Sequence, residues 1–367
     1  MTEFMYNRAT TSVQRAATPD LSFVVPTDGD FSSLKRTIAA LAAQTIRNRI
    51  ELVVVTPRDG VEIPDGLDMF WGVTVVNGGP IISSNLSRIA GIRVASSAIV
   101  ALGEDHCYPD PEWAEALLSA YAEDVAAVGP VFRTANPRST LAWMNFLVEY
   151  GEWMEPAPRR EAPEIAGHNS SYRRDLLLAY GDELETVFEV EGVTQAQLRA
   201  KGYRIIVEPK ARTSHLNFSS LAATVRLRFQ GSRLFAAYRA QQWTLQRRVL
   251  YTVGSPLIPV VRFVRIVRAL AQTPEHRTLL PRVLPALAFG LVVSAIGELA
   301  GYVAGPGRSR EKTGGIEFSR RRYLNASDRH DFDLAQANVQ VFGGDGGNVT
   351  TSSMKPRRSG ITSTTPV

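Results

Sequence analysis

The chain has 367 residues, of which 44% are hydrophobic, and it carries a formal net charge of +5. This length and hydrophobic content suffice for one sizeable domain with appendages, and they exclude a wholly disordered protein. The single cysteine, Cys107, excludes an intrachain disulfide and is typical of a reducing compartment. Residues 1–20 contain no apolar run, so we expect a disordered leader without a signal peptide.

A strand, a helix and a second strand follow the leader. Residues 21–26 are apolar enough for a buried strand, and residues 27–30 are typical of a loop and helix cap. Apolar residues at helical spacing over 34–45 predict a helix with one buried face, and residues 50–56 predict the next strand. This order is that of a βαβ unit, whose two strands run parallel. We therefore predict an α/β fold with a doubly wound, mostly parallel sheet.

The same alternation continues along the chain. Residues 73–76, 98–102 and 125–132 predict further strands, and residues 83–95 and 113–122 predict helices. Because parallel strands end at the same edge of the sheet, polar residues that follow them are expected to converge there.

One such strand ends abruptly in charged residues. Glu104, Asp105 and His106 follow the apolar run 98–102, and a Pro-Asp-Pro turn then starts a helix. Glu104 and His106 offer a carboxylate oxygen and an imidazole nitrogen, both of which suit Mn²⁺ or a similar ion. Such a cation would neutralise a diphosphate. On these residues alone, a solvated loop is the commoner interpretation.

With its flanks, this stretch resembles the metal-binding motif of family-2 glycosyltransferases, in which a strand ends in Asp-x-Asp before a Pro-Asp-Pro-x-Trp helix start. Glu104 and His106 stand at the two acid positions of that motif. Residues 209–215 match the family's Pro-x-Ala-x-x-x-His ending, although a lone histidine is more often structural. The resemblance implies a GT-A-like domain over residues 21–216. It also implies a divalent cation, Mn²⁺ or Mg²⁺, held by Glu104, His106 and His215.

Three further segments match the family pattern for the donor, which is a nucleotide sugar. Pro26 and Thr27 match the start of the nucleotide-binding pattern, and Asp105 lies between two of the implied metal ligands. Arg88 and Gly91 are in register with the family's Ala-Arg-Asn-x-Gly-Ile segment. The resemblance therefore implies that Pro26, Thr27, Arg88 and Asp105 contact the donor, while the alternative for Arg88 is an exposed helical arginine.

The remaining matches concern the acceptor and the catalytic base. The segment that starts at Gly167 resembles the family's acceptor-facing turn, which implies acceptor contacts by His168 and Asn169. Glu191 falls on the acid that serves as base in the family, with Glu189 as the fallback. An inverting transfer needs a base because the acceptor hydroxyl loses its proton as it attacks. A carboxylate at a helix start is also a common capping arrangement, and this alternative stays open.

The C-terminal part has a different composition. Residues 209–274 contain no Asp or Glu, while arginines recur among apolar side chains, a pattern typical of helices on an anionic bilayer. Residues 283–304 are nearly long enough to span a bilayer, but Glu298 makes full spanning costly. We predict amphipathic and hydrophobic membrane-associated helices over 217–304, peripheral, monotopic or single-span, and a disordered tail over 305–367.

Together these features predict a glycosyltransferase at the cytoplasmic face of the cell membrane. It would move a sugar from a nucleotide-diphosphate donor to a lipid-linked or polysaccharide acceptor, with inversion and without a nucleic-acid partner. His106, Ile89 and Val190 depart from the family pattern. These departures favour the rival reading, a catalytically inactive, membrane-bound sugar-nucleotide-binding or scaffold homologue.

Overall fold

The computed structural model describes residues 6–9, 17–80, 84–241, 243–318 and 320–339. Within them, a ten-stranded sheet has the order β1-β4-β3-β2-β5-β9-β7-β10-β6, and β8 pairs with β10. The strands are β1 (Tyr6–Ala9), β2 (Leu21–Pro26), β3 (Ile50–Thr56), β4 (Gly72–Asn77), β5 (Ile99–Leu102), β6 (Cys107–Pro109), β7 (Val125–Thr134), β8 (Arg160–Glu161), β9 (Ser171–Arg173) and β10 (Arg204–His215).

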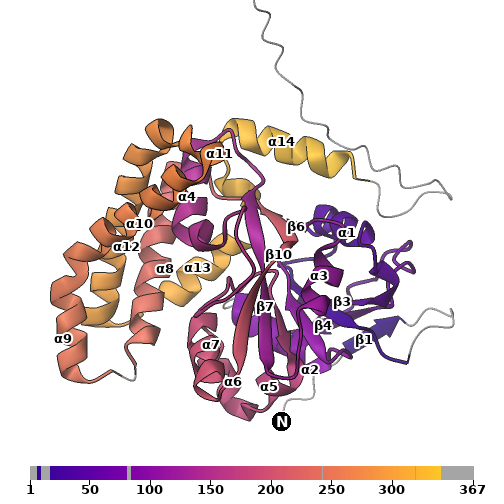
Figure 1. The fold of residues 1–367 in the computed structure, drawn as a ribbon. Coiled ribbons are helices and arrows are strands. Elements are labelled where there is room, and N and C mark those ends of the chain that lie inside the picture. Colours follow the sequence, from indigo (N-terminus) through magenta and orange to yellow (C-terminus); the bar gives the residue numbers. More distant parts are fainter. Residues whose placement is uncertain (1–5, 10–16, 81–83, 242, 319, 340–367) are drawn as a thin grey trace, which may run out of the picture.

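Helices flank the sheet and continue beyond it (Figure 1). Those interspersed with the strands are α1 (Lys35–Ala42), α2 (Ser84–Val94), α3 (Trp113–Ser119), α4 (Thr140–Tyr150), α5 (Arg174–Leu178), α6 (Leu184–Val187) and α7 (Glu191–Ala200). Those after β10 are α8 (Leu221–Arg239), α9 (Leu245–Gly254), α10 (Ile258–Gln272), α11 (Pro274–Arg277), α12 (Leu280–Ala304), α13 (Ser309–Glu317) and α14 (Ala326–Ala337), with a short 3₁₀ helix, η5 (Arg320–Tyr323), before α14.

The predicted α/β fold is confirmed. Strands β4, β3, β2 and β5 pair in parallel, as do β7 and β10, while β9 joins the two groups by antiparallel pairing. Every residue of β2 and β3 is buried, because apolar clusters cover both faces of the sheet. Continuous apolar runs such as 50–56 are what strands buried on both faces require.

Gly91 sets the distance between α2 and the sheet. A Cβ atom at this position would lie 2.4 Å from Val24 Cγ1 and 2.9 Å from Val55 Cγ2. Only a glycine therefore lets α2 approach β2 and β3 this closely, which fits the close packing expected from its place in the motif.

Helices α8 to α12 form a unit beside the sheet, whereas α14 lies apart from them, near α1 (Figure 1). Helix α12 packs lengthwise on α8. A Cβ atom at Gly297 would lie 2.4 Å from the Phe229 carbonyl oxygen, and one at Gly301 would lie 2.4 Å from the Arg233 carbonyl oxygen. A further apolar cluster joins α4 to α10 and α12, with Phe146 and Leu287 at its centre. One hydrophobic cluster thus crosses the predicted boundary near residue 217.

Two stretches predicted to be disordered have regular structure. Tyr6–Ala9 forms β1, which pairs antiparallel with β4, whereas residues 1–5 and 10–16 of the leader lie outside the described residues. The tail prediction is wrong for residues 309–317, 320–323 and 326–337, which form α13, η5 and α14; residues 340–367 lie outside the described part. Buried Ile316 and Leu324 anchor the segment, and ion pairs such as Arg138–Asp331 attach it to the domain.

Two helical stretches, Leu245–Gln272 and Leu280–Ala304, are long and apolar enough to cross a membrane by length and composition alone. Within the most apolar window of each stretch, the buried share is 11% for the first and 44% for the second. Glu298 of α12 is buried and paired with Arg262 of α10 at 3.3 Å, so its charge faces protein.

Candidate active site and metal centre

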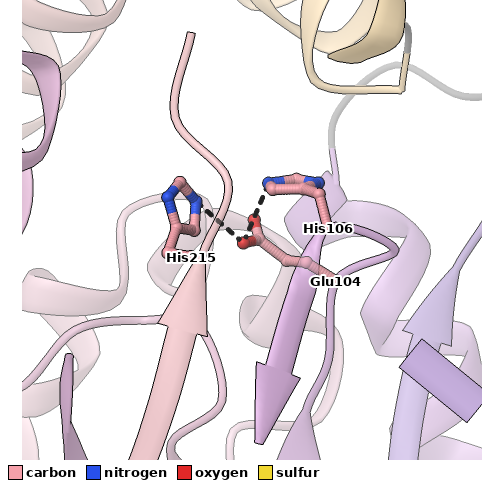
Figure 2. A group of neighbouring side chains, drawn as sticks. All are labelled: Glu104, His106 and His215. Carbon is pink, nitrogen blue, oxygen red and sulfur yellow. Dashed lines mark ion pairs between the residues drawn. The ribbon is translucent and has the colours of Figure 1, made fainter. Parts of the chain in front are cut away.

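Strand pairing brings Glu104, His106 and His215 together. Strand β6 pairs antiparallel with the end of β10, in a register that sets Cys107 opposite His215. Glu104 and His106 precede β6 directly, so their side chains meet that of His215 at this edge (Figure 2). One potential ligand atom from each residue lies within 4.8 Å of the others, and all three residues are buried. The structure thus unites the three residues predicted to hold a cation.

Hydrogen bonds aim both imidazoles at the same point. Nδ1 of His106 lies 2.6 Å from Asp105 Oδ1, and Nδ1 of His215 lies 2.8 Å from Asn217 Oδ1. Donation from each Nδ1 leaves the Nε2 atoms facing Glu104 Oε2, at 3.2 Å and 3.6 Å. Second acceptors of this kind orient histidine ligands in metal sites. A carboxylate and two Nε2 atoms are a donor set that fits Mn²⁺ or a similar divalent cation.

Burial and neighbouring charges set the protonation of the three side chains. Burial opposes ionisation of Glu104, but His168 and His106 outweigh it and hold its pKa well below the usual range. Burial lowers the pKa of His215 to about 4, which leaves a neutral imidazole. Burial and Arg320 oppose protonation of His106, yet Glu104 and Asp105 raise its pKa to about 9. A bound cation would take the place of that proton.

Arg88 lies beneath this cluster. It is fully buried, so the alternative of an exposed helical arginine is wrong. Its guanidinium lies 3.5 Å from Glu104 Oε1 and 3.6 Å from Glu191 Oε1, and it donates to Asn85 Oδ1 at 2.6 Å. Arg88 therefore lies between the predicted base and the cluster of Glu104, His106 and His215, which is called the metal group below. Its contact with the donor stays a prediction.

The two candidate bases differ in their surroundings. Glu191 is the first residue of α7, Val190 is its N-cap, and Glu191 Oε1 has no hydrogen-bond partner among the described residues. By contrast, the buried carboxylate of Glu189 accepts a hydrogen bond from Arg310 Nε at 2.9 Å. Glu191 Oε1 thus faces only the more distant Arg88 guanidinium, at 3.6 Å, and accepts no hydrogen bond within the described residues.

The predicted acceptor residues are separated by their exposure. His168 Nδ1 lies 3.0 Å from Glu104 Oε1, and its side chain is 21% exposed, so it borders the metal group and is partly accessible to solvent. Asn169 is fully buried with φ of 51°, and its backbone N–H donates to the Leu102 carbonyl at 2.7 Å. Its position fixes the loop on β5, and its contact with an acceptor stays a prediction.

A cavity of about 470 Å³ adjoins the metal group. On the sheet side it is lined by Asp28, Ser33, Asp105 and His106. Thr27 lies just below, buried, with Oγ1 3.0 Å from Ser33 Oγ, so it shapes the loop after β2. On the opposite side the cavity is lined by residues of the C-terminal segment: Phe318, Arg320, Arg321, Arg322, Arg329 and Phe332.

Sequence reasoning missed several of these residues. Asp28 falls in the stretch 27–30, whose sequence predicts only a loop and helix cap, and no pattern marks Ser33, although both lie soon after a strand whose end is at the ligand-binding edge. The arginines of residues 320–329 lie in the segment expected to be disordered. Their clustering in the sequence, three in a row, was the available signal.

Comparison with known proteins identifies the family. The sequence model described as "Glycosyltransferase like family 2" matches residues 19–233, more than half of the chain. The chain belongs to this family. The match covers β2 to α8, and so contains Glu104, His106, His215 and both candidate bases, but not the arginines of residues 320–329.

Two individual glycosyltransferases are similar to this family member. The glucosyl-dolichyl phosphate glucuronosyltransferase of Haloferax volcanii is 25% identical over 211 residues, which are 51% of this chain and 66% of that protein. The mannosyltransferase PcManGT of Pyrobaculum calidifontis, solved with GDP-Man and Mn²⁺, is 16% identical with a TM-score of 0.46; the match covers 81% of this chain and 91% of the other. The second similarity is too low to support a functional argument.

Proposed function

We propose that this family-2 glycosyltransferase moves a sugar from a nucleotide-diphosphate donor to a lipid-linked or polysaccharide acceptor, with inversion, at the cytoplasmic face of the membrane. The observation that carries the proposal is the Glu104–His106–His215 cluster beside a cavity of about 470 Å³ at the carboxyl edge of the sheet. Ligands of open α/β sheets bind at this edge, and the volume lies in the range of small-molecule sites.

The residues of the cluster fit a divalent cation, Mn²⁺ or Mg²⁺. When bound, the cation supplies positive charge to the leaving diphosphate. Glu104, His106 and His215 would hold it, with Asp105 and Asn217 fixing the two rings by their hydrogen bonds. Pro26 and Thr27, at the end of β2, would border the nucleotide.

Glu191 is the proposed catalytic base. Its carboxylate, which accepts no hydrogen bond at Oε1 from the described residues, would accept the proton of the acceptor hydroxyl as that oxygen attacks the anomeric carbon. Arg88, 3.6 Å away, holds this carboxylate in place from below. His168, partly buried beside Glu104, is proposed to contact the acceptor together with Asn169.

The exposed apolar side chains of α9, α10 and α12 support membrane association. Leu245, Val253 and Leu257 are 76%, 74% and 67% exposed, and Val292, Ile296 and Val303 form a similar row on α12. Trp243, Tyr251 and Tyr302 cluster at one end beside Arg239 and Arg247, as aromatic and basic residues do at a bilayer surface. Because α12 packs lengthwise on α8 and α4, we propose monotopic insertion.

Turnover of a donor panel tests this function. The full chain in detergent would be mixed with UDP-, GDP-, CDP- and dTDP-sugars, with Mn²⁺, with Mg²⁺ or with EDTA, and nucleoside diphosphate release would be measured. We expect cation-dependent release from one donor class, and a product of inverted anomeric configuration by NMR when an acceptor is supplied. Donor binding without any turnover, in every combination, would support the inactive-homologue reading instead.

A further inference from the structure

We propose that the segment 309–337, which lies outside the family match, completes the donor site and binds the diphosphate through Arg320, Arg321, Arg322 and Arg329. This inference rests on the proposed function, because it assigns the ligand of the same cavity. It makes the C-terminal segment part of the binding machinery.

Arg320 is the innermost of these arginines. It is only 5% exposed, its guanidinium lies 3.7 Å from the centre of the Phe218 ring, and it donates to Glu317 Oε2 at 2.6 Å. It also contacts Nε2 of His106, the nitrogen that would ligate the cation. Its Nε atom is buried without a hydrogen-bond partner among the described residues. A buried, under-used guanidinium therefore faces the place where cation and diphosphate would meet.

Arg321, Arg322 and Arg329 line the same cavity further out, and together with Arg320 they form its cationic wall. Arg321 pairs with Asp333 at 2.6 and 2.7 Å, whereas Arg322 and Arg329 make no ion pair with a carboxylate among the described residues. Arg329 donates to the Leu324 carbonyl, while its Nε is buried and unpartnered. Four arginines against two aspartates line the cavity, so it favours an anion. Guanidinium groups bind phosphate oxygens in bidentate fashion.

The position of the cavity favours the donor over a phosphate on the acceptor. Its other wall, Asp28 and Ser33, belongs to the loop after β2, at the sheet edge where nucleotides bind. None of its lining residues comes from α9, α10 or α12, the helices proposed to face the bilayer. A lipid-linked phosphate would approach from those helices.

The contact between Arg320 and His106 predicts a coupling between cation and diphosphate. A cation at His106 Nε2 must displace the guanidinium from that nitrogen. The diphosphate then offers Arg320 new oxygen partners, so cation and nucleotide should each strengthen the binding of the other. Without nucleotide, Arg320 competes with the cation.

Substitutions in the full chain test the proposal. Arg321→Gln and Arg322→Gln remove exposed charges from the wall. Arg308→Gln, on an exposed arginine directly before the segment and outside the cavity, is the matched control. Calorimetric titration with UDP, GDP, CDP, ADP and dTDP in the presence of Mn²⁺ should show about tenfold weaker binding for each wall variant. The control should bind like the wild type, and the matching monophosphates should lose less affinity.

Arg320→Gln supplies a second readout. It should weaken binding of the nucleoside diphosphate and strengthen binding of Mn²⁺ alone, measured by electron paramagnetic resonance. A purely structural arginine would weaken both.

Unchanged diphosphate affinity in the wall variants, with a wild type that binds, would overturn this inference and leave the proposed function standing. Farnesyl phosphate, titrated in the same way, stands for a lipid-linked acceptor. If the wall variants lose binding of farnesyl phosphate alone, the wall serves the acceptor and this inference is overturned. A wild type that binds none of the five diphosphates would overturn the proposed function itself.

Discussion

Glu191 and Glu189 lie two residues apart and differ in what holds their carboxylates. Glu189 is paired with Arg310, whereas Glu191 Oε1 has no hydrogen-bond partner among the described residues. If Glu191 is the base, Glu191→Gln should preserve donor affinity and slow transfer by roughly two to four orders of magnitude. Single-turnover rates and donor titrations would measure the two effects separately.

Glu189→Gln is the control for that experiment. It weakens the contact with Arg310 and should lower thermal stability slightly while transfer continues. An inactive Glu189→Gln beside an active Glu191→Gln would move the base to Glu189. Activity in both variants would refute the mechanism proposed here.

Glu104 is the single carboxylate of the predicted metal group. Glu104→Ala should abolish cation-dependent donor binding, because the two imidazoles that remain cannot offset the charge of a divalent ion. Titration of the donor with and without Mn²⁺ measures this. Glu112→Ala, at an exposed position of the same stretch, should behave like the wild type. Equal donor affinity in Glu104→Ala and wild type, with cation present, would exclude Glu104 as a ligand.

At the scale of elements, the outer face of α9 and α10 is the surface proposed to meet the membrane. Replacing Leu250, Val253 or Val260, all more than half exposed, with Gln should reduce co-sedimentation with anionic vesicles by roughly tenfold per residue. The reason is that burying each side chain contributes about 1.5 kcal/mol. Leu334→Gln on α14, where Leu334 is 49% exposed, is the control and should sediment normally. Vesicle binding unaffected by all three changes would exclude this face.

The contact of α2 with β2 and β3 depends on Gly91. Gly91→Ala should destabilise the protein by about 1–3 kcal/mol, because the new Cβ would overlap Val24 and Val55. Thermal unfolding followed by circular dichroism measures the loss. Gly231→Ala in α8 has no atom within 4 Å of the new Cβ and should be neutral or slightly stabilising. Similar shifts in both variants would contradict close packing at Gly91.

At the scale of the whole molecule, the sheet domain and the C-terminal helices share a core. Phe146 and Leu147 of α4 pack with Ile266, Leu287 and neighbouring residues of α10 and α12. A fragment that ends at Leu216 should therefore expose this cluster, aggregate and bind hydrophobic dyes. Size-exclusion chromatography against the full chain would show it. A monomeric fragment with cooperative unfolding would prove the two parts independent.

The parallel strands were predictable from local patterns, because apolar runs mark them. The ends of parallel strands meet at one edge, which places Glu104 and His106 there. His215, by contrast, was implied only by the resemblance to the family's Pro-x-Ala-x-x-x-His ending. Burial of Arg88 was not predictable in this way. It depends on carboxylates 16 and 103 residues further along the chain, Glu104 and Glu191, which only the fold brings beside it.

The C-terminal segment shows the same limit. Its composition, poor in apolar residues, predicts disorder when a segment must form its own core. Here the core already exists, and the segment docks on it through Leu324 and through polar contacts such as Asn136 with Asp328 at 2.9 Å. Pairs separated by nearly 200 residues leave no local signal.

The late position of Arg320 in the chain has a consequence for biogenesis. Translation completes the whole family domain, and then α9, α10 and α12, before the ribosome reaches the arginines that line the cavity. A nascent chain at this stage therefore contains the predicted metal ligands and the candidate base, but the arginines of the cationic wall have not yet been synthesised. If that wall captures the donor, the order of synthesis delays sugar-nucleotide capture until the helices that face the bilayer have emerged. A stop codon after Gly305 would then yield a chain with every family motif and little affinity for its donor.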